Sequence, residues 1–137
     1  MQEDSQMKGM TMATAHTLTE TDLAHFTGTE NHYKHALMRN VLYSDGAKYV
    51  ADTGGAHWLL DIIASMQLDA KVKGEEFQVW QLNTFKKDNS DSHYGILTCG
   101  DGNGNEVYRQ KIGYTDFPLP EIKFYYTNNV IHLPSEY

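Results

Sequence analysis

The spacing of the apolar residues changes once along the chain, and this change constrains the fold more than any other feature of the sequence. Before the change, apolar residues recur at the i, i+3, i+4, i+7 spacing that places them on one face of an α-helix: Ala56, Leu59, Leu60 and Ile63. Gly54-Gly55 directly precedes them and suits a sharp chain entry. The pattern predicts a core helix over about residues 55–67.

After Gly74 the pattern becomes that of β-strands, because aromatic and β-branched residues gather in short segments separated by turn formers. These segments are 77–85, 94–99, 106–114, 122–126 and 130–133. The turn formers at 101–105 and 127–129 predict hairpins, with a helix over 119–126 as the alternative near the end. The second half therefore predicts an antiparallel sheet of four to five strands over about residues 76–133.

The first part of the chain gives weaker signals. Residues 1–16 are polar, rich in methionine and without periodicity, so we expect a disordered tail. Thr17-Leu18-Thr19-Glu20 has the spacing of a capping box and predicts a short helix that ends near Gly28. Residues 36–53 fit either strand or helix, and a second short helix at 46–53 is favoured. The whole predicts a single α+β domain over 17–137, with short N-terminal helices and one core helix packed on the sheet.

Charge and cysteine content exclude several classes of protein. Eleven basic and 18 acidic residues give a net charge of -7, and no window clusters Lys and Arg as a phosphate-binding groove requires, so we expect no direct nucleic-acid binding. Cys99 is the single cysteine, which excludes an internal disulfide and predicts a buried structural thiol. The longest apolar run, 58–64, is far shorter than a membrane span. We therefore expect a cytoplasmic protein without membrane contact.

Histidines are the first candidates for chemistry, because the chain has seven of them. His32 and His35 lie three residues apart, a spacing that can place two imidazoles on one side of a helical turn as metal ligands. A recognised zinc spacing is absent from the sequence, so a solvated polar segment is the alternative. We expect neither a metal nor another cofactor.

A second candidate lies on the predicted core helix, where His57, Asp61 and Ser65 follow each other at intervals of four residues. A hydrolytic triad needs its histidine between the hydroxyl and the carboxylate, whereas this order places the carboxylate in the middle. The stripe therefore fits the solvent-facing side of an amphipathic helix better. If the protein is an enzyme, the residues to examine are Asp45, Asp61, Asp116 and His57.

The aromatic residues suggest a binding surface, because nine tyrosines exceed what a core of this size needs. Tyrosine has a large apolar face and a polar tip, which suits both an interface and a half-buried sheet, and both interpretations stay open. The residues chosen as binding candidates are Tyr43, Trp58, Trp80, Tyr108 and Tyr125.

Six short strings together resemble a bacterial and phage-associated domain of unknown function that is common in cyanobacterial genomes and mobile elements. They are FTGT (26–29), YSDG (43–46), GAHWLLD (55–61), FQVW (77–80), YTDFPL (114–119) and LPSEY (133–137). The resemblance covers about residue 20 to the end and supplies no catalytic residues. It implies an accessory protein of a phage or mobile element that binds something.

Three functions follow as hypotheses. The preferred one is a non-enzymatic protein that binds a protein partner, such as a host defence complex that it inhibits in the manner of an anti-CRISPR protein, with homo-oligomerisation left open. It predicts an exposed apolar or tyrosine-rich patch. The alternatives are a protein that sequesters a small ligand or nucleotide in an aromatic-lined site, and an enzyme with a cleft where ionisable groups meet.

Overall fold

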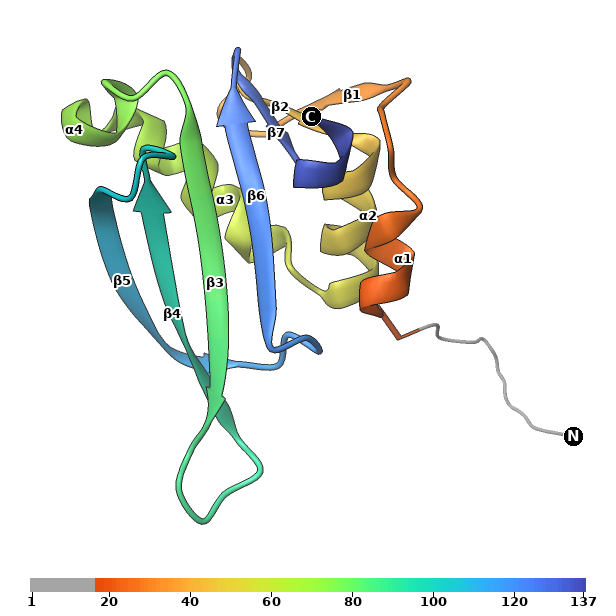
Figure 1. Cartoon of the computed structure of the whole chain (residues 1–137), viewed down its shortest axis with the longest axis vertical. Coiled ribbons are helices and arrows are strands. Elements are labelled where there is room, and N and C mark those ends of the chain that lie inside the picture. Colours follow the sequence, from red (N-terminus) through yellow and green to blue (C-terminus); the bar gives the residue numbers. More distant parts are fainter. Residues whose placement is uncertain (1–16) are drawn as a thin grey trace, which may run out of the picture.

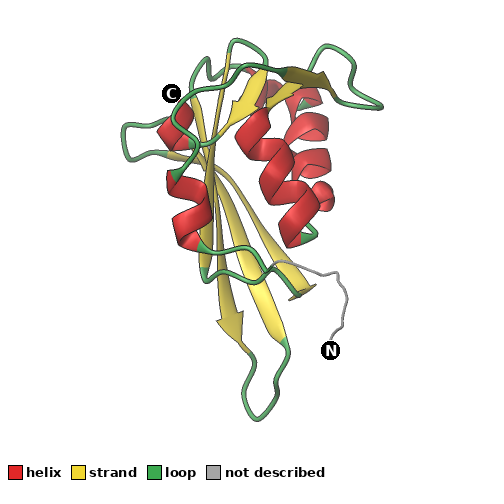
Figure 2. Cartoon of the chain, turned by 90° about the vertical axis from the view of Figure 1, so that its right-hand side faces the viewer, coloured by secondary structure: helices red, strands yellow, loops and turns green. Residues whose placement is uncertain are grey.

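One curved sheet with its two longest helices packed on one of its faces forms the domain (Figure 1). The computed structural model describes residues 17–137, so the predicted tail at 1–16 lies outside the described residues. Figure 2 shows the strands as a twisted layer with the two long helices lying together beside it. The predicted α+β class is confirmed.

The sheet has seven strands in the order β1-β2-β7-β6-β3-β4-β5. Their bounds are β1 His32–Lys34, β2 Leu42–Ser44, β3 Gln78–Lys86, β4 His93–Gly100, β5 Glu106–Thr115, β6 Glu121–Thr127 and β7 Val130–His132. All neighbouring pairs are antiparallel except β2 and β7, which are parallel. The expectation of four to five antiparallel strands is therefore corrected: two short N-terminal strands extend the sheet and make it mixed.

The helical elements lie both before and after the predicted core helix along the chain. Their bounds are α1 Glu20–Ala24, α2 Asp45–Gly54, α3 His57–Ser65, α4 Ala70–Lys73 and the 3-10 turns η1 Met66–Leu68 and η2 Pro134–Glu136. The core helix predicted over 55–67 is confirmed as α3 and η1. Gly55 has φ 64°, a left-handed conformation that residues with a side chain resist, and it separates α2 from α3.

Two ambiguous segments are now assigned. Residues 36–53 contain both elements that they suggested, because strand β2 leads directly into helix α2 through the N-cap Ser44. Residues 121–127 form strand β6, so the helical alternative for 119–126 is wrong. The capping box of α1 uses Thr19 and Asp22 instead of the Thr17 and Glu20 pair predicted for it.

The core lies between the helices and one face of the sheet. From the sheet, the side chains of Trp80, Leu82, Leu97 and Phe124 are at most 1% exposed. They meet a helix layer whose buried residues include those predicted for the core helix: Ala56, Leu59, Leu60 and Ile63. Burying such side chains contributes about 1.5–3 kcal/mol each, so this face supplies most of the folding free energy.

The C-terminal turn η2 locks onto the start of α2. The Glu136 carboxylate accepts hydrogen bonds from the buried Ser44 hydroxyl at 2.6 Å, from the Gly46 amide at 2.9 Å and from the Leu133 amide at 2.9 Å. A side chain at Gly46 has no room, since a Cβ there would lie 2.5 Å from Glu136 Oε1. The YSDG and LPSEY strings of the sequence are thus two halves of one structural contact.

Candidate functional site

The second face of the long strands carries no α-helix among residues 17–137, and the short 3-10 turn η2 contacts it at β6. Figure 1 shows this open face toward the viewer with α3 behind β3 and β6. Side chains alternate along each strand, so every second residue points away from the core. Along β3 these residues are Val79, Gln81, Asn83 and Phe85, none of which is buried. The open face is this surface of β3, β4, β5, β6 and β7.

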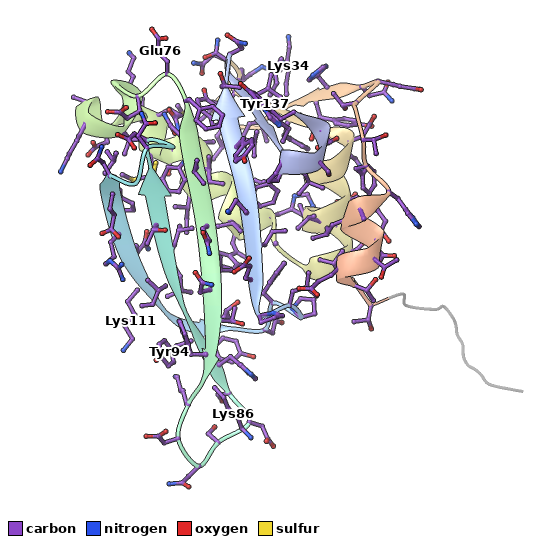
Figure 3. The ribbon with its side chains drawn as sticks, in the orientation of Figure 1. Lys34, Glu76, Lys86, Tyr94, Lys111 and Tyr137 are labelled. Carbon is purple, nitrogen blue, oxygen red and sulfur yellow. The ribbon has the colours of Figure 1, made fainter. Side chains whose placement is uncertain are left out.

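Four rings meet at the upper end of the open face and are named the upper cluster: Phe77, Tyr125, His132 and Tyr137. Tyr125 lies at the centre, with its ring centroid 4.9 Å from that of Phe77, 6.0 Å from His132 and 5.5 Å from Tyr137. The Tyr137 ring stacks on His132 with 7° between the planes, and its side chain is 74% exposed (Figure 3). Rings in such contacts stabilise one another and still present an apolar surface to a partner.

A hollow of about 470 Å³ adjoins the upper cluster. Phe77 and Tyr125 form one wall, and the glycine-rich hairpin turn at 101–105 forms another. Gly102 is required there, because it has φ 86° and a Cβ would lie 2.9 Å from the Phe77 ring. Lys123 also lines this hollow, so a flat ring and an anion could be held together there.

Two rows of side chains, polar except for Ile96, cross the middle of the open face and are named the polar belt. The strand register places each row side by side across β6, β3, β4 and β5. The first row is Lys123, Gln81, Thr98 and Arg109, and the second is Glu121, Asn83, Ile96 and Lys111. Arg109 makes a two-fold contact with Glu106 at 3.0 and 2.9 Å, which raises the pKa of Arg109 and lowers that of Glu106.

A second aromatic group, the lower cluster, lies beyond the polar belt and consists of Phe85 and Tyr94. Their rings stack with centroids 5.3 Å apart, and Phe85 is 43% exposed. The Lys111 ammonium lies 5.1 Å from the centroid of the Tyr94 ring, and Figure 3 shows these two side chains next to each other. The open face thus has an aromatic group at each end and a polar belt between them.

The predicted binding residues separate into core and surface. Trp80 is corrected to a core residue, since it is 1% exposed and donates its indole N–H to buried Gln78 at 2.8 Å. Tyr108 packs on Trp80 from the covered side, and Trp58 is half-buried on α3. Tyr43 stacks on Tyr33. Tyr125 alone of the five predicted residues belongs to the open face.

Sequence reasoning missed Phe77, Phe85, Tyr94, His132 and Tyr137 as members of this surface. Their clustering depends on which strands pair and in which register, and neither is readable from local sequence. One signal was available within β3, where alternate positions are apolar on one side and mixed polar and aromatic on the other.

The Asp45 carboxylate is a structural group. Its oxygens accept hydrogen bonds from the Tyr33 hydroxyl and from the amides of Glu30 and Asn31, each at 3.0–3.1 Å. Partial desolvation raises the pKa of Asp45, but these hydrogen bonds outweigh it and hold the pKa below its ordinary value. Asp45 therefore fixes the 29–31 loop to the start of α2.

Asp61, which lies on the exposed side of α3, binds a histidine from another segment. The Nε2 atom of buried His35 lies 2.7 Å from Asp61 Oδ1, and its Nδ1 atom accepts the amides of Leu37 and Met38. A ring nitrogen that accepts two amides carries no proton, so Nε2 donates to Asp61. Both nitrogens are occupied, and this pair anchors the 35–38 loop to α3.

The other histidines of the early hypotheses are exposed. His32 is on edge strand β1 and does not join His35 in a cluster, since no group of three potential metal ligands forms among residues 17–137. His57 lies on the solvent side of α3 with Asp61 and Ser65, as the stripe predicts, and its Nε2 lies 2.7 Å from Asp52. His57 and Asp61 thus have different partners and do not form a catalytic pair.

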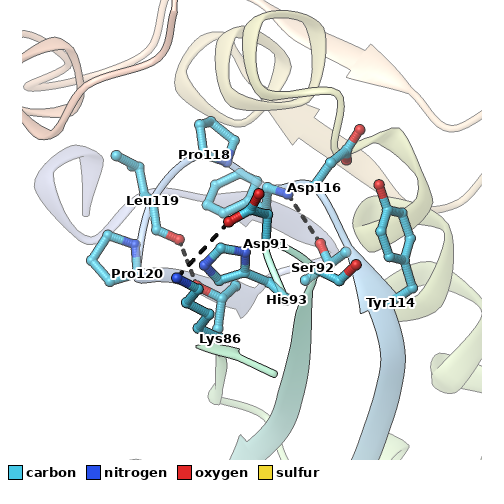
Figure 4. Close-up of a pocket in the computed structure, with 12 residues that line it drawn as sticks. Lys86, Asp91, Ser92, His93, Tyr114, Asp116, Pro118, Leu119 and Pro120 are labelled. Atoms are coloured by element: carbon cyan, nitrogen blue, oxygen red, sulfur yellow. Dashed lines mark hydrogen bonds and ion pairs between the residues drawn. The ribbon is translucent and has the colours of Figure 1, made fainter. Parts of the chain in front are cut away.

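Asp116 lines a concavity of about 630 Å³ at the lower end of the sheet (Figure 4). Lys86 at the end of β3, His93 at the start of β4 and Asp91 in the turn between them also line it, with Lys86 Nζ 3.9 Å from Asp91 Oδ1. This weak ion pair joins exposed side chains, and Asp116 makes no hydrogen bond within residues 17–137. The concavity brings ionisable groups together but does not arrange a base against a nucleophile.

Residues 17–137 form a small α+β domain with one mixed sheet and an open face that has aromatic groups at both ends. No helix in these residues is long and apolar enough to cross a bilayer. A family model places the domain further: the Family of unknown function (DUF6876) matches residues 17–137, and the chain belongs to that family. No match was found among curated proteins or among solved structures.

Proposed function

We propose that this protein is a non-enzymatic binding protein that contacts a protein partner through the open face of its sheet. The observation that carries the proposal is the pair of aromatic clusters on a face without a helix cover. Exposed aromatic residues are enriched in protein interfaces, where a few of them supply much of the binding free energy.

The remainder of the molecule supports a binding role over a catalytic one. Two carboxylates with lowered pKa values make contacts that hold the fold: Asp45 binds the 29–31 loop, and Asp101 binds its own hairpin turn. Burial raises the pKa of the Cys99 thiol to about 12, which suppresses its nucleophilicity. Activated groups directed into a cleft are what an enzyme requires.

The biological setting of the proposal rests on the resemblance described for the sequence. A phage or mobile element that carries this protein would use it as an accessory factor in the host cytoplasm, with a host defence complex as the protein target. A flat surface of this kind suits the capture of a large partner, because it offers area instead of a deep pocket.

The hollow beside the upper cluster supports a second candidate, the sequestration of a small aromatic ligand such as a nucleotide. Phe77 and Tyr125 would stack on the ring, and Lys123 would meet the anionic group. If a nucleotide binds in this hollow, we expect it to slow amide hydrogen exchange in the turn around Gly102.

Affinity capture of the tagged chain from host lysate, with mass spectrometry of proteins and small molecules, tests both candidates. We expect a protein partner that is lost with the double variant Phe85→Ser and Tyr137→Ser, because both side chains are exposed members of the clusters. The matched control is Leu37→Ser with Leu68→Ser, which removes apolar side chains that are 84% and 75% exposed outside the open face. Equal capture by both double variants would refute the open face as the contact surface, and recovery of the protein alone would contradict both candidates.

A further inference from the structure

The side chains of the open face include one more cation than carboxylates, whereas the whole chain is acidic. The chain has a net charge of -7, yet the open face carries three cations, Arg109, Lys111 and Lys123. Arg109 is paired with Glu106, and Glu121 accepts the side-chain amides of Gln81 and Asn83 at 3.2 and 3.3 Å.

The two lysines are the cations of this face that have no carboxylate partner. No carboxylate within residues 17–137 lies within ion-pair distance of Lys111 or Lys123. They lie on β5 and β6, on either side of the two central strands. An acidic molecule that crosses the polar belt would therefore gain charge complementarity that the chain itself does not satisfy.

The distance between the two aromatic clusters sets the length of such a partner. Val79 is in register with Tyr125 of the upper cluster, and Phe85 belongs to the lower cluster. These positions are six steps apart along β3, which corresponds to about 20 Å at about 3.3 Å per residue. An extended segment of about seven residues spans this length with a side chain at each end.

We propose that the open face recognises an acidic protein segment, with apolar side chains about 20 Å apart on the two aromatic clusters and carboxylates over Lys111 and Lys123. This inference rests on the proposed function and adds the chemistry of the partner. The clusters provide the apolar anchors, and the polar belt selects for negative charge between them.

A protein segment fits this surface better than a nucleic acid. A nucleic acid has a continuous line of phosphates and needs many cations to release its counterions, whereas the open face offers two lysines without a carboxylate partner. The chain's net charge of -7 would repel such a polyanion as a whole. A short acidic segment with apolar ends needs a few cations only.

A probe peptide tests the inference directly. The peptide has tryptophan at both ends and five glutamates between them, which gives it the length of about seven extended residues. In a titration followed by amide chemical shifts, we expect changes on β3, β4, β5 and β6. The double variant Lys111→Glu and Lys123→Glu should weaken binding by about tenfold or more, and added salt should weaken binding to the native chain.

Two further double variants and a control peptide separate the effect of charge from that of misfolding. The variant Lys71→Glu with Lys73→Glu makes the same charge change on α4 and should bind the peptide with little loss. If the glutamate variant is misfolded, the double variant Lys111→Gln and Lys123→Gln replaces it. Its amide spectrum shows whether it is folded, and its affinity for the peptide should still fall severalfold. The peptide with lysines in place of glutamates should not bind.

Three results would overturn the inference: equal binding of the lysine peptide, shifts confined to the helices, or tighter binding of single-stranded oligothymidylate than of the acidic peptide. The proposed function fails separately. If the cluster variant loses the natural partner while the glutamate variant keeps it, the open face is the contact surface and the acidic chemistry is wrong.

Discussion

The two faces of the sheet are made by alternate residues of the same strands, yet they are built for different purposes. On the covered face, Trp80, Leu82 and Phe124 are at most 1% exposed and pack against helices. On the open face, Val79, Gln81 and their neighbours remain half-buried at most. A fold of this size needs one core, so the aromatic residues on the second face are in excess of what folding requires.

The difference shows how to separate stability from binding in this molecule. Substitutions on the covered face remove packing and change the free energy of unfolding. Substitutions on the open face leave the core intact and change what the surface can contact. Neighbouring residues of one strand can therefore serve as matched pairs of variants.

The largest expected effect on stability comes from such a pair on β4. Leu97→Ala removes a side chain with 0% exposure from the core, and we expect a loss of about 3 kcal/mol in the free energy of unfolding. Ile96→Ala, the next residue, lies on the open face and should cost less than about 1 kcal/mol. Urea denaturation of both variants measures the contrast. Similar losses for the two would mean that the open face is covered in solution.

The second prediction concerns the C-terminal lock, the hydrogen bonds by which Glu136 of η2 holds the start of α2. Glu136→Gln removes the charge that receives the Ser44 hydroxyl and the Gly46 amide, so we expect a loss of about 2 kcal/mol. Because Tyr137 follows directly, the variant should also loosen the stack on His132, visible as faster exchange of ring signals in NMR. Glu76→Gln, an exposed change elsewhere, is the control and should leave stability unaltered. An unchanged urea midpoint for Glu136→Gln would argue against the lock.

A third test compares the faces by thiol reactivity. Cys99 is buried on the covered face, and burial, with a smaller effect of Glu75, raises the pKa of its thiol to about 12. We expect it to react with a disulfide reagent at least about 100-fold more slowly than in the unfolded chain. Thr98→Cys in a Cys99→Ala background places the thiol on the open face, where it should react readily. Fast labelling of native Cys99 would contradict the assignment of the faces.

The smallest expected effect is a dependence of stability on pH that arises from Asp45, at the start of α2. The pKa of Asp45 is lowered from its ordinary value of 3.8, so its ionised form stabilises the fold above that pH and this stabilisation is lost as the pH falls through the lower folded-state value. We expect Asp45→Asn to be destabilised at neutral pH and to approach the native chain in acid. Urea midpoints measured at several pH values check the sign. A gap that widens in acid would contradict it.

The sequence was sufficient to predict the elements in which apolar residues recur with a clear period. The core helix at 57–65 repeats its apolar residues over two turns, and β3 to β6 are long enough to show strand character. The strands β1 and β2 have three residues each, too few for a period, so β1 was missed and β2 was only one of two alternatives for residues 36–53. The parallel pairing of β2 with β7 joins residues about 90 positions apart and is set by packing instead of local preference.

The site was less predictable than the fold. Tyrosine counts pointed to a binding surface, but residue type alone could not tell Trp80, which faces the core, from Tyr125, which faces solvent. That distinction depends on the register of β3 against β6. Likewise, the link between His35 and Asp61 crosses 26 positions and brings a loop onto a helix, which no local spacing could indicate.

The position of β7 in the sheet has a consequence for synthesis of the chain. Residues 130–132 lie between β2 and β6, so they connect the N-terminal hairpin to the other strands. On the ribosome, the hairpin and α2 emerge well before residues 130–132, their neighbour in the sheet. The edge of β2 that pairs with β7 in the folded domain therefore stays unpaired until these residues have been made, and an unpaired strand edge favours contact with other chains.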